Sequence, residues 1–460
     1  MSTRQDQLHS YQFAVQRVVA ALVMHDTHPA RSPFRRVAGA TLAGLLVAAI
    51  GIGGAAVYGL LVGGGAQSWR SPNAVLVEKE TGARYVYRDG RLHPVANYAS
   101  ALLLSGGRAP TRVGRAALTG TPRGVPVGIP DAPDALPPAR SLSTPPWSVC
   151  SVDTAEPGAR SILMIGSAPQ GGAPLGDRAM LARAGRDNYL VWRQRRHLIR
   201  DSGAVLAALG WADRTARRVA PATLRALGAG ADLGLPEIPR RGDRFGGLPR
   251  ARVGQVFVIR DRVSGGGQHA VAMADGLAPI TGLQARLILA DPRSLQDGPT
   301  ELSVADFARA PRRAPLTSGD IAPPAEPPEL ADPGAGAGAV CAVVRDDDGV
   351  GEVRVGAVAP DQRAAVPTVR RSAAGAELAD VVLVPPGGGA VVASVARPGA
   401  PAVTCLVTDL GRRHGVADPT ALRLLGYGQV TPARLPASVV ALLPAGPGLD
   451  AADAARPVTG

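Results

Sequence analysis

Residues that could hold a nucleotide phosphate are scarce in this sequence. Lys79 is the single lysine, and it lies between the carboxylates of Glu78 and Glu80. A P-loop needs a Gly-Lys-Ser or Gly-Lys-Thr sequence, because the lysine must reach the β- and γ-phosphates. The glycine runs at 265–267 and 387–389 have no lysine beside them and fit turns. We therefore expect no P-loop nucleotide site in this chain.

Other familiar catalytic patterns are missing too. The sequence contains no His-Glu-x-x-His and no Gly-x-Ser-x-Gly, and the place of its lysine excludes Ser-x-x-Lys. Residues 346–349 (Asp-Asp-Asp-Gly) lack the alternating ligands of an EF-hand loop, so they favour a hairpin turn over a calcium site. His93 precedes Pro94 at a predicted turn, which favours a structural role. The sequence predicts no catalytic residue, no cofactor and no metal site.

The basic charge of the chain is spread out rather than gathered. The net charge is +13, and all basic residues except one are arginine. A nucleic-acid surface usually combines clustered basic residues with aromatic ones. Here arginine is scattered among Pro, Gly and Asp, and only 3% of residues are aromatic. We expect a solvated basic surface and no nucleic-acid partner, with binding of anionic cell-envelope polymer as the alternative.

One uncharged stretch, residues 37–62, is the most apolar segment of the chain. As a helix it would be ~39 Å long, against a bilayer hydrocarbon core of ~30 Å. A cleaved signal peptide has a shorter apolar region that begins nearer the N-terminus. The stretch therefore predicts a retained transmembrane helix.

The charges on either side of this stretch predict its orientation. Three arginines lie within residues 31–36, and the first basic residue after the stretch is Arg70. Because basic residues stay in the cytoplasm, residues 1–36 are expected inside and residues 63–460 outside. Trp69 follows the exit of the helix and is expected at the outer membrane interface.

The cytoplasmic segment contains an apolar stripe. Within residues 4–24, apolar side chains recur at alternating steps of three and four, at Leu8, Tyr11, Val15, Val18 and Leu22. This spacing is typical of an amphipathic helix. Such a helix could lie on the membrane or bind a partner protein. Its polar face is rich in glutamine rather than lysine or arginine, which favours a cytoplasmic partner protein.

After the membrane helix, one order of predicted elements occurs four times. Each copy has two β-type runs around a turn, often a second turn of the Asp-Gly kind, and then a helix-type segment. The second copy has Gln194-Arg195 in place of that Asp-Gly pair. The copies lie at residues 74–104, 179–210, 256–289 and 391–426. Their irregular spacing is typical of diverged modules. We predict four ββα-type repeat domains at residues 74–130, 176–239, 250–310 and 389–450.

The remaining segments predict a central domain and its connections. Residues 140–175 and 339–388 are β-rich, do not fit the repeat, and are expected to form one central β domain from two pieces of chain. Residues 236–249 are expected to be a short linker. Residues 311–338, rich in Pro, Ala and Gly, are expected to be a connector without its own core. Residues 451–460 are expected to form a tail.

Three cysteines allow one disulfide in an exported domain. Cys405 lies in an alternating apolar run, where a buried free thiol is the default. Cys150 and Cys341 each lie in a short strand-like run that follows a segment rich in Pro or Gly. Of the three possible pairings, these residues favour Cys150 with Cys341. A disulfide that closes so long a loop would stabilise the fold in the chain-entropy model.

Several segments resemble the EccB family, a membrane core component of actinobacterial type VII (ESX) secretion systems. They are RQDQLHSYQFAVQRVVAALV, the apolar stretch, WRSPNAVLVEKETGARYVYRDGRLHPVANYASALLL, PRGVPVGIPDAPDALPPARSLSTPPWSVC, ADGLAPIT and LGYGQV with LPASVVALLPAGPGLD. The resemblance implies a single-pass membrane protein with an α+β exported region, built from a central β-rich domain and four repeat domains. It also implies a conserved disulfide, which falls on Cys150 and Cys341. Ala96 stands where the family usually has Leu, and Cys405 is extra.

The resemblance also implies a function and a location. It implies a structural subunit of the inner (plasma) membrane that braces the export channel, with the N-terminus cytoplasmic and the C-terminal region periplasmic. Partners would be the EccC ATPase, EccD, EccE and further copies of the chain, with secreted proteins handled indirectly. Two alternatives remain: a module that binds cell-envelope polymer, and an ATPase, as some family names state.

Overall fold

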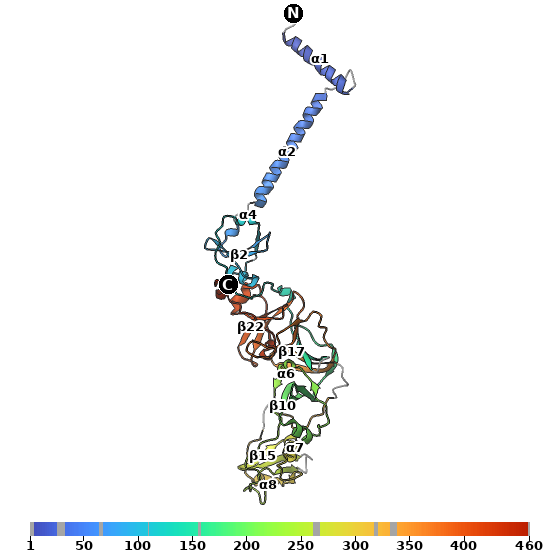
Figure 1. Cartoon of the computed structure of the whole chain (residues 1–460), viewed down its shortest axis with the longest axis vertical. Coiled ribbons are helices and arrows are strands. Elements are labelled where there is room, and N and C mark those ends of the chain that lie inside the picture. The colour runs from blue at the N-terminus through green and yellow to red at the C-terminus, as the bar shows by residue number, and fades with distance from the viewer. Residues whose placement is uncertain are drawn as a thin grey trace.

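The structure of the chain is a computed structural model that describes residues 4–24, 33–63, 68–108, 110–154, 158–260, 267–316, 321–331 and 338–458. The predicted turn at 265–267 falls mostly outside the described residues. Figure 1 shows an elongated molecule, in which two N-terminal helices extend away from a string of small sheets.

Helix α1 (Arg4–Met24) covers the segment in which the sequence predicts an amphipathic helix. Its apolar side chains lie open to solvent in the single chain. Leu8, Tyr11 and Leu22 are 58%, 71% and 73% exposed. Whatever covers this stripe is therefore not among the described residues of the same chain.

Helix α2 (Pro33–Gly63) is long and apolar enough to cross a bilayer. At 1.5 Å per residue its 31 residues span roughly 46 Å. The window Ala38–Val57 has a mean hydropathy of 2.1, and none of it is buried against the rest of the described chain. A helix of this length without protein cover needs lipid around its side chains. The one candidate membrane span agrees with the sequence prediction.

Five sheets follow α2, and four of them are built alike. We call these four sheets, with their helices, modules 1 to 4. Each begins with three antiparallel strands, passes through a helix, and adds a fourth strand parallel to the first. A second short helix follows the fourth strand in every module.

The elements of the modules are as follows in chain order. Module 1 contains β1 (Ala74–Glu78), β2 (Arg84–Arg88), β3 (Arg91–Pro94), α3 (Tyr98–Ser105), β4 (Thr111–Val113) and α4 (Arg115–Leu118). Module 2 contains β8 (Met180–Ala184), β9 (Asp187–Trp192), β10 (Arg195–Ile199), α5 (Ser202–Ala208), β11 (Arg217–Arg218), α6 (Pro221–Ala226) and an added strand β12 (Gly228–Ala229). Module 3 contains β13 (Val256–Arg260), β14 (Gly267–Met273), β15 (Gly276–Ile280), α7 (Gly282–Ala290), β16 (Thr300–Glu301) and α8 (Val304–Arg309). Module 4 contains β21 (Gly389–Val395), β22 (Ala402–Thr408), β23 (Arg413–Gly415), α9 (Pro419–Leu424), β24 (Ala433–Pro436) and α10 (Ala437–Val440).

The modules therefore contain more elements than the expected ββα order. Each has a third strand before its first helix, and a fourth strand and a second helix after it. The third strand, such as RLHP in β3, is only four residues long and shows no apolar alternation by itself. The fourth strand is as short, and its pairing with β1 joins residues that lie far apart in the sequence. Both strands form because neighbouring strands offer free backbone groups, which local sequence patterns do not reveal.

The second tight turn of module 2 lies one residue earlier than the sequence predicts. β9 ends at Trp192 and β10 begins at Arg195, so Arg193 and Gln194 make the turn. Their φ angles are 46° and 60°, both in the left-handed region. Two-residue hairpin turns need this geometry, because it matches the twist of the flanking strands.

The fifth sheet lies in the middle of the string. It has seven strands, in the order β19-β20-β6-β5-β17-β18-β7. They are β5 (Trp147–Asp153), β6 (Ala159–Met164), β7 (Gly171–Pro174), β17 (Ala339–Asp346), β18 (Gly349–Ala357), β19 (Val366–Pro367) and β20 (Val381–Leu383). Its strands come from both of the separated β-rich segments that the sequence assigns to a central domain. The hairpin expected at residues 346–349 joins β17 to β18.

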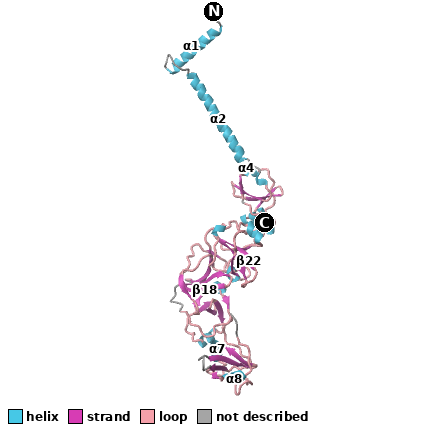
Figure 2. Ribbon diagram, turned by 180° about the vertical axis from the view of Figure 1, so that it is seen from behind, coloured by secondary structure: helices cyan, strands magenta, loops and turns pink. Residues whose placement is uncertain are grey.

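The chain runs out along the string and then returns (Figure 1). Module 1 lies next to α2, and module 3, with α8, forms the far end. Module 4 and then the central sheet follow module 1, and module 2 precedes module 3. Figure 2 shows from behind that the C-terminus lies beside module 1, far from module 3.

Neighbouring modules meet through equivalent helices. In the cluster shared by modules 1 and 4, α3 packs against α9. In the cluster shared by modules 2 and 3, α5 packs against α7. Modules 2 and 4 meet through α6 and α10 on one face of the central sheet. The string is thus held by continuous apolar packing, with no bare linker between these modules.

The segments predicted as linkers and tail pack against modules. In the 236–249 segment, Ile238 and Phe245 are 8% and 2% exposed and join the clusters of module 3. The described part of the 311–338 segment runs back along modules 3 and 2, where the backbone carbonyl of Ile321 accepts from Ala231 N at 2.7 Å. Helix α11 (Ala451–Ala454), in the predicted tail, packs against α3. These segments have little core of their own, and they pack against the modules beside them instead.

Trp69 lies in a protein core and not at a membrane interface. It belongs to the short helix η1 (Ser68–Arg70), is 2% exposed, and packs edge-to-face on Tyr87 with ring centroids 5.5 Å apart. The expectation from its position after α2 is therefore wrong, because β2 offers the indole a closer apolar partner.

Candidate functional site

Cys150 and Cys341 form a disulfide between β5 and β17. The two residues face each other in the antiparallel register, with Cα atoms 4.0 Å and sulfur atoms 2.11 Å apart. Both are fully buried, and 191 residues separate them in the sequence. The bond joins the outgoing and returning pieces of the central sheet. It is the pair that the sequence favoured.

A second link between the same two pieces lies one strand away. Asp380 Oδ2 accepts hydrogen bonds from Ser161 N at 2.8 Å and from Ser161 Oγ at 2.6 Å. In return, Ser161 Oγ accepts from Asp380 N at 2.9 Å. Arg370 pairs with the other carboxylate oxygen at 3.1 Å. No local pattern in the sequence predicts this contact, because its members are 219 residues apart.

Cys405 is the remaining thiol and is buried in module 4. It is 2% exposed, and this burial raises the pKa of its thiol. A protonated, enclosed thiol is a poor nucleophile. Its place in the structure agrees with the buried free thiol that the sequence predicts.

The acidic residues on both sides of the lone lysine bind arginine and backbone rather than phosphate. Glu78 is 5% exposed and pairs with Arg115 at 2.7 Å. Hydrogen bonds from Arg115 and Thr81 lower the pKa of Glu78. Glu80 accepts from the backbone N of Arg115 at 2.9 Å. These contacts hold α4 on the sheet of module 1.

The acidic run at residues 346–349 makes a hairpin with local contacts. Asp347 pairs with Arg434 of module 4 at 2.9 Å, and Asp346 accepts from the backbone N of Asp348 at 3.1 Å. Among the described residues, no group of three His, Cys, Asp or Glu side chains is arranged to hold a metal ion.

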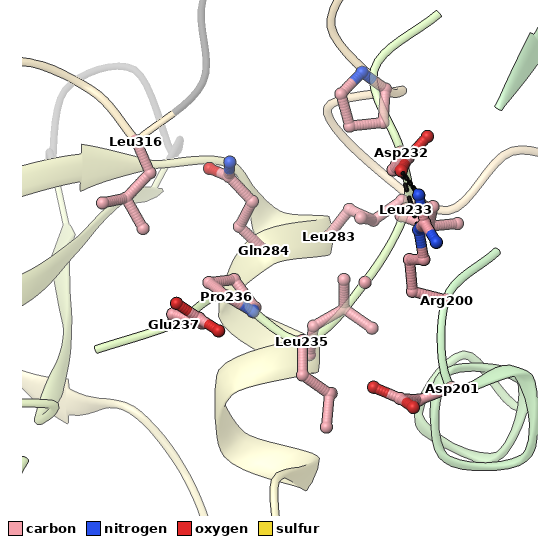
Figure 3. A pocket seen from close by; sticks show the side chains of 13 residues that line it. Arg200, Asp201, Asp232, Leu233, Leu235, Pro236, Glu237, Leu283, Gln284 and Leu316 are labelled. Carbon is pink, nitrogen blue, oxygen red and sulfur yellow. Dashed lines mark hydrogen bonds and ion pairs between the residues drawn. The ribbon is translucent and has the colours of Figure 1, made fainter. Parts of the chain in front are cut away.

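The pocket in Figure 3 lies between modules 2 and 3 and has a volume of about 510 Å³. Leu283 and Gln284 of α7 line one side, and the segment from Leu233 to Glu237 lines another. Its charged groups lie at an open rim. Arg200 and Asp232 pair there at 2.8 Å, and their side chains are 63% and 46% exposed. An exposed ion pair of this kind contributes little to stability, because both groups remain solvated.

Three modules share a histidine on the third strand that holds a returning segment of chain. In each, ring Nδ1 lies close to a backbone carbonyl oxygen, and because a carbonyl only accepts, Nδ1 carries the hydrogen. The pairs are His93 with Val125 at 3.0 Å, His197 with Ala231 at 2.8 Å, and His414 with Pro447 at 3.1 Å. The structural role predicted for His93 thus recurs in modules 2 and 4, where no sequence pattern predicts it.

A glycine lies against each of these imidazole rings. A Cβ atom built on the glycine would lie 2.1 to 2.3 Å from the nearest ring atom. These glycines are Gly124, Gly230 and Gly446. Module 3 lacks both partners, because the aligned positions after the bridge Leu277–Arg312 are Ala278 and Arg313. Each module thus has either both the histidine and the glycine or neither of them.

Two of these histidines are almost completely buried, and their burial lowers the pKa of the ring. His197 and His414 are 0% and 2% exposed, and desolvation lowers the pKa of each imidazole below its ordinary value. His197 Nε2 is buried without a hydrogen-bond partner among the described residues. Both rings are therefore neutral at pH 7, with the hydrogen on Nδ1.

Comparisons with known proteins agree with this architecture. Residues 1–458 match the family described as "Type VII secretion system ESX-1, transport TM domain B" (EccB). The "ESX-3 secretion system ATPase EccB3" of Mycolicibacterium smegmatis is 30% identical, over 97% of this chain and 89% of that protein. The "ESX-5 secretion system ATPase EccB5" of Mycobacterium tuberculosis is 29% identical, over 99% of this chain and 93% of that protein.

Solved structures show the same likeness. A chain in an intact ESX-5 inner membrane complex aligns over 100% of this chain and 96% of its own length, with a TM-score of 0.60 and 27% identity. A chain of an EccB3 dimer from the ESX-3 core complex aligns over 83% of this chain and 100% of its own length, with a TM-score of 0.58 and 29% identity. The chain therefore belongs to the EccB family, the membrane components of ESX (type VII) secretion systems.

Proposed function

We propose that this chain is a non-enzymatic brace of an ESX secretion complex, anchored by α2 and built outside the cytoplasm from a string of packed modules. The observation that carries this proposal is the continuous apolar packing from module 1 to module 3, which makes the string a stiff body on one membrane helix. Three carboxylates of the string serve structural contacts: Glu78 pairs with Arg115, Asp347 pairs with Arg434, and Asp380 binds Ser161.

The orientation is part of this proposal. Arginines within residues 31–36 precede α2, and α1 is the only described element before it. The positive-inside rule then puts α1 in the cytoplasm and the modules in the periplasm. The disulfide supports this side, because such bonds persist in oxidising compartments.

We also propose that modules 1 to 4 are four copies of one repeat domain. Their common strand order, their equivalent helix contacts and the histidine–glycine pair that recurs in modules 1, 2 and 4 support a common origin. The boundaries would follow the predicted ones, residues 74–130, 176–239, 250–310 and 389–450, with the central domain at 140–175 and 339–388.

The partners follow from the relatives. Because the similar chains occur in an ESX inner membrane complex and in a dimer, we propose that this chain self-associates and binds EccC, EccD and EccE. Energy for transport would come from EccC, a separate cytoplasmic ATPase. Purification of the tagged full chain in mild detergent, followed by mass spectrometry, should recover these subunits in stable ratios. Recovery of the chain alone under conditions that keep the other subunits together would contradict the proposal.

The word ATPase in the names of the relatives gives a second candidate function. It is tested by titrating the purified full chain with Mg-ATP up to millimolar concentration and measuring binding and phosphate release. We expect neither, and Lys79→Ala should behave as the wild type. Saturable hydrolysis that Lys79→Ala removes would support the ATPase and overturn the brace as the sole role.

A further inference from the structure

The histidine-held segments of modules 2 and 4 lead directly into contacts between modules. In module 2, the held segment continues to Leu233, which is 1% exposed and packs with Leu283 and Leu287 of α7 in module 3. In module 4, it continues to Leu449, which is fully buried in the cluster shared with module 1. Loss of either segment would remove apolar cover from a junction between modules.

Each held segment is fixed by backbone hydrogen bonds as well as by the ring contact. In module 2, Gly230 N donates to Arg196 O at 2.9 Å, Leu233 N to Leu198 O at 2.8 Å, and Arg200 N to Leu233 O at 2.8 Å. In module 4, Gly446 N donates to Arg413 O at 2.8 Å, Leu449 N to Gly415 O at 2.7 Å, and Ala417 N to Leu449 O at 3.1 Å. The imidazole, packed on glycine, adds a side-chain contact whose free energy changes when the ring takes up a proton.

The charges around the rings are few. Arg195, on the same strand as His197, disfavours a positive ring, and Asp232, on the held segment, favours one. Arg412 disfavours a positive charge on His414, as Arg195 does on His197. The held segment opposite His414, residues 444–449, carries no charge. His93 is less enclosed, and Arg88 and Asp89 line the same pocket as its ring. Neither buried ring has a carboxylate within hydrogen-bonding contact to stabilise a second proton.

We propose that His197 and His414 form an acid-sensitive clamp that loosens the junctions between modules 2 and 3 and between modules 4 and 1. A second proton, taken from solvent at Nε2, would put a positive charge into a buried site. For His197 it would also create an N–H group without an acceptor among the described residues. When the segment opens, the ring is exposed to water and takes up the proton without this desolvation cost.

The direction of the effect follows from proton linkage. An exposed imidazole has a pKa of about 6.5, and the closed form binds the proton less well than the open form. Falling pH therefore favours the open form. The effect begins near pH 6.5, the approximate pKa of the exposed imidazole, and continues until the pH reaches the lowered pKa of the closed form. Between pH 7.5 and 5.5, the closing equilibrium of each segment should fall by up to about tenfold, the limit set by the pKa of the exposed imidazole. Module 3, with Ala278 in place of the histidine, should not respond.

Amide hydrogen exchange of the full chain in detergent, measured at pH 7.5 and 5.5 and corrected for intrinsic rates, tests the clamp. We expect the protection of the amides of Gly230, Leu233, Gly446 and Leu449 to fall by up to about tenfold at pH 5.5. The amide of Arg313, which donates to Leu277 O at 3.0 Å in module 3, is the internal control. An equal loss at Arg313, or no loss in modules 2 and 4, overturns the proposal.

The variant His197→Asn with His414→Asn separates titration from packing. An Asn side-chain N–H can donate to the same carbonyl but takes up no proton in this pH range. The double variant should keep protection at pH 7.5 and lose the acid response. An acid response that persists in the Asn variant would show that other groups cause it. If the double variant does not fold, the comparison with Arg313 in the wild-type chain still decides the question.

Discussion

At the scale of single residues, modules 1, 2 and 4 share a contact between an imidazole ring and a glycine. The ring of His197 fills the space where a Cβ on Gly230 would lie, 2.2 Å from the nearest ring atom. The ring cannot yield easily, because Leu190 stands opposite it on β9 and is fully buried. Any side chain on this glycine must therefore displace the imidazole or the returning backbone.

We expect Gly230→Ala to destabilise the folded chain by about 1–3 kcal/mol, the usual cost of forcing extra atoms into a packed site. Gly203→Ala is the matched control, because Gly203 lies in α5 with nothing within 4 Å of a built Cβ. Thermal unfolding of both variants measures the difference. Equal midpoints for the two variants would mean that the site at Gly230 has room after all.

Sequence patterns reach some of these residues and miss others for a physical reason. The pair Cys150 and Cys341 could be favoured because each cysteine lies in a strand-like run that local alternation reveals. Ser161 with Asp380 could not be foreseen, because a hydrogen bond across 219 residues leaves no mark on either neighbourhood. The same holds for the rings of modules 2 and 4, whose partners are backbone carbonyls that any residue can supply.

At the scale of elements, adjacent strands β5 and β17 carry the crosslink in a fully buried register. The sequence shows both strands clearly, because each is a continuous apolar run. It does not show the short third and fourth strands of the modules, whose pairing depends on tertiary neighbours. Helix α7 shows a further limit, since its apolar residues face two modules at once.

Reduction of the Cys150–Cys341 bond should cost about 2–5 kcal/mol, because it releases a loop constraint of 191 residues in the unfolded chain. The double variant Cys150→Ser with Cys341→Ser should show the same loss in denaturant unfolding. Cys405→Ala, which removes the free thiol, should lose less and should remain sensitive to reductant. A double variant as stable as the wild type would contradict the role given to the bond.

Truncation of Leu283 tests the junction between modules 2 and 3. Leu283 is fully buried in the cluster of module 2 although it belongs to α7 of module 3. We expect Leu283→Ala to cost about 2–5 kcal/mol, the range for buried leucines. Leu295→Ala, at a site 47% exposed, should change stability little. Urea unfolding that shows no difference between these variants would mean that the two modules are not coupled by α7.

At the scale of the whole molecule, the returning path of the chain brings its last described residues back to module 1, at the end of the string next to α2. Val458 N donates to Pro126 O at 2.9 Å, and Gly128 N donates to Arg456 O at 3.2 Å. Module 1 is thus held by the last described residues as well as by its link to α2. The sequence predicts the modules in order but not this return, because it predicts residues 451–460 as a tail.

Deletion of residues 450–460 should free module 1 from module 4, because it removes α11 and both of these hydrogen bonds. We expect limited proteolysis of the connection between module 1 and the central sheet to become about tenfold faster, in line with local opening. Deletion of residues 459–460 alone should leave the rate unchanged. Equal rates for the two deletions would show that the α3–α9 packing is sufficient by itself.

The same return decides where a reporter can be placed. A fluorophore or affinity handle fused after residue 458 would lie beside module 1, where this module meets module 4, although residue 458 follows module 4 in the sequence. Its signal would describe events at the end of the string that is nearer to α2. A probe meant to sense the outermost reach of the protein has to be attached on α8 instead.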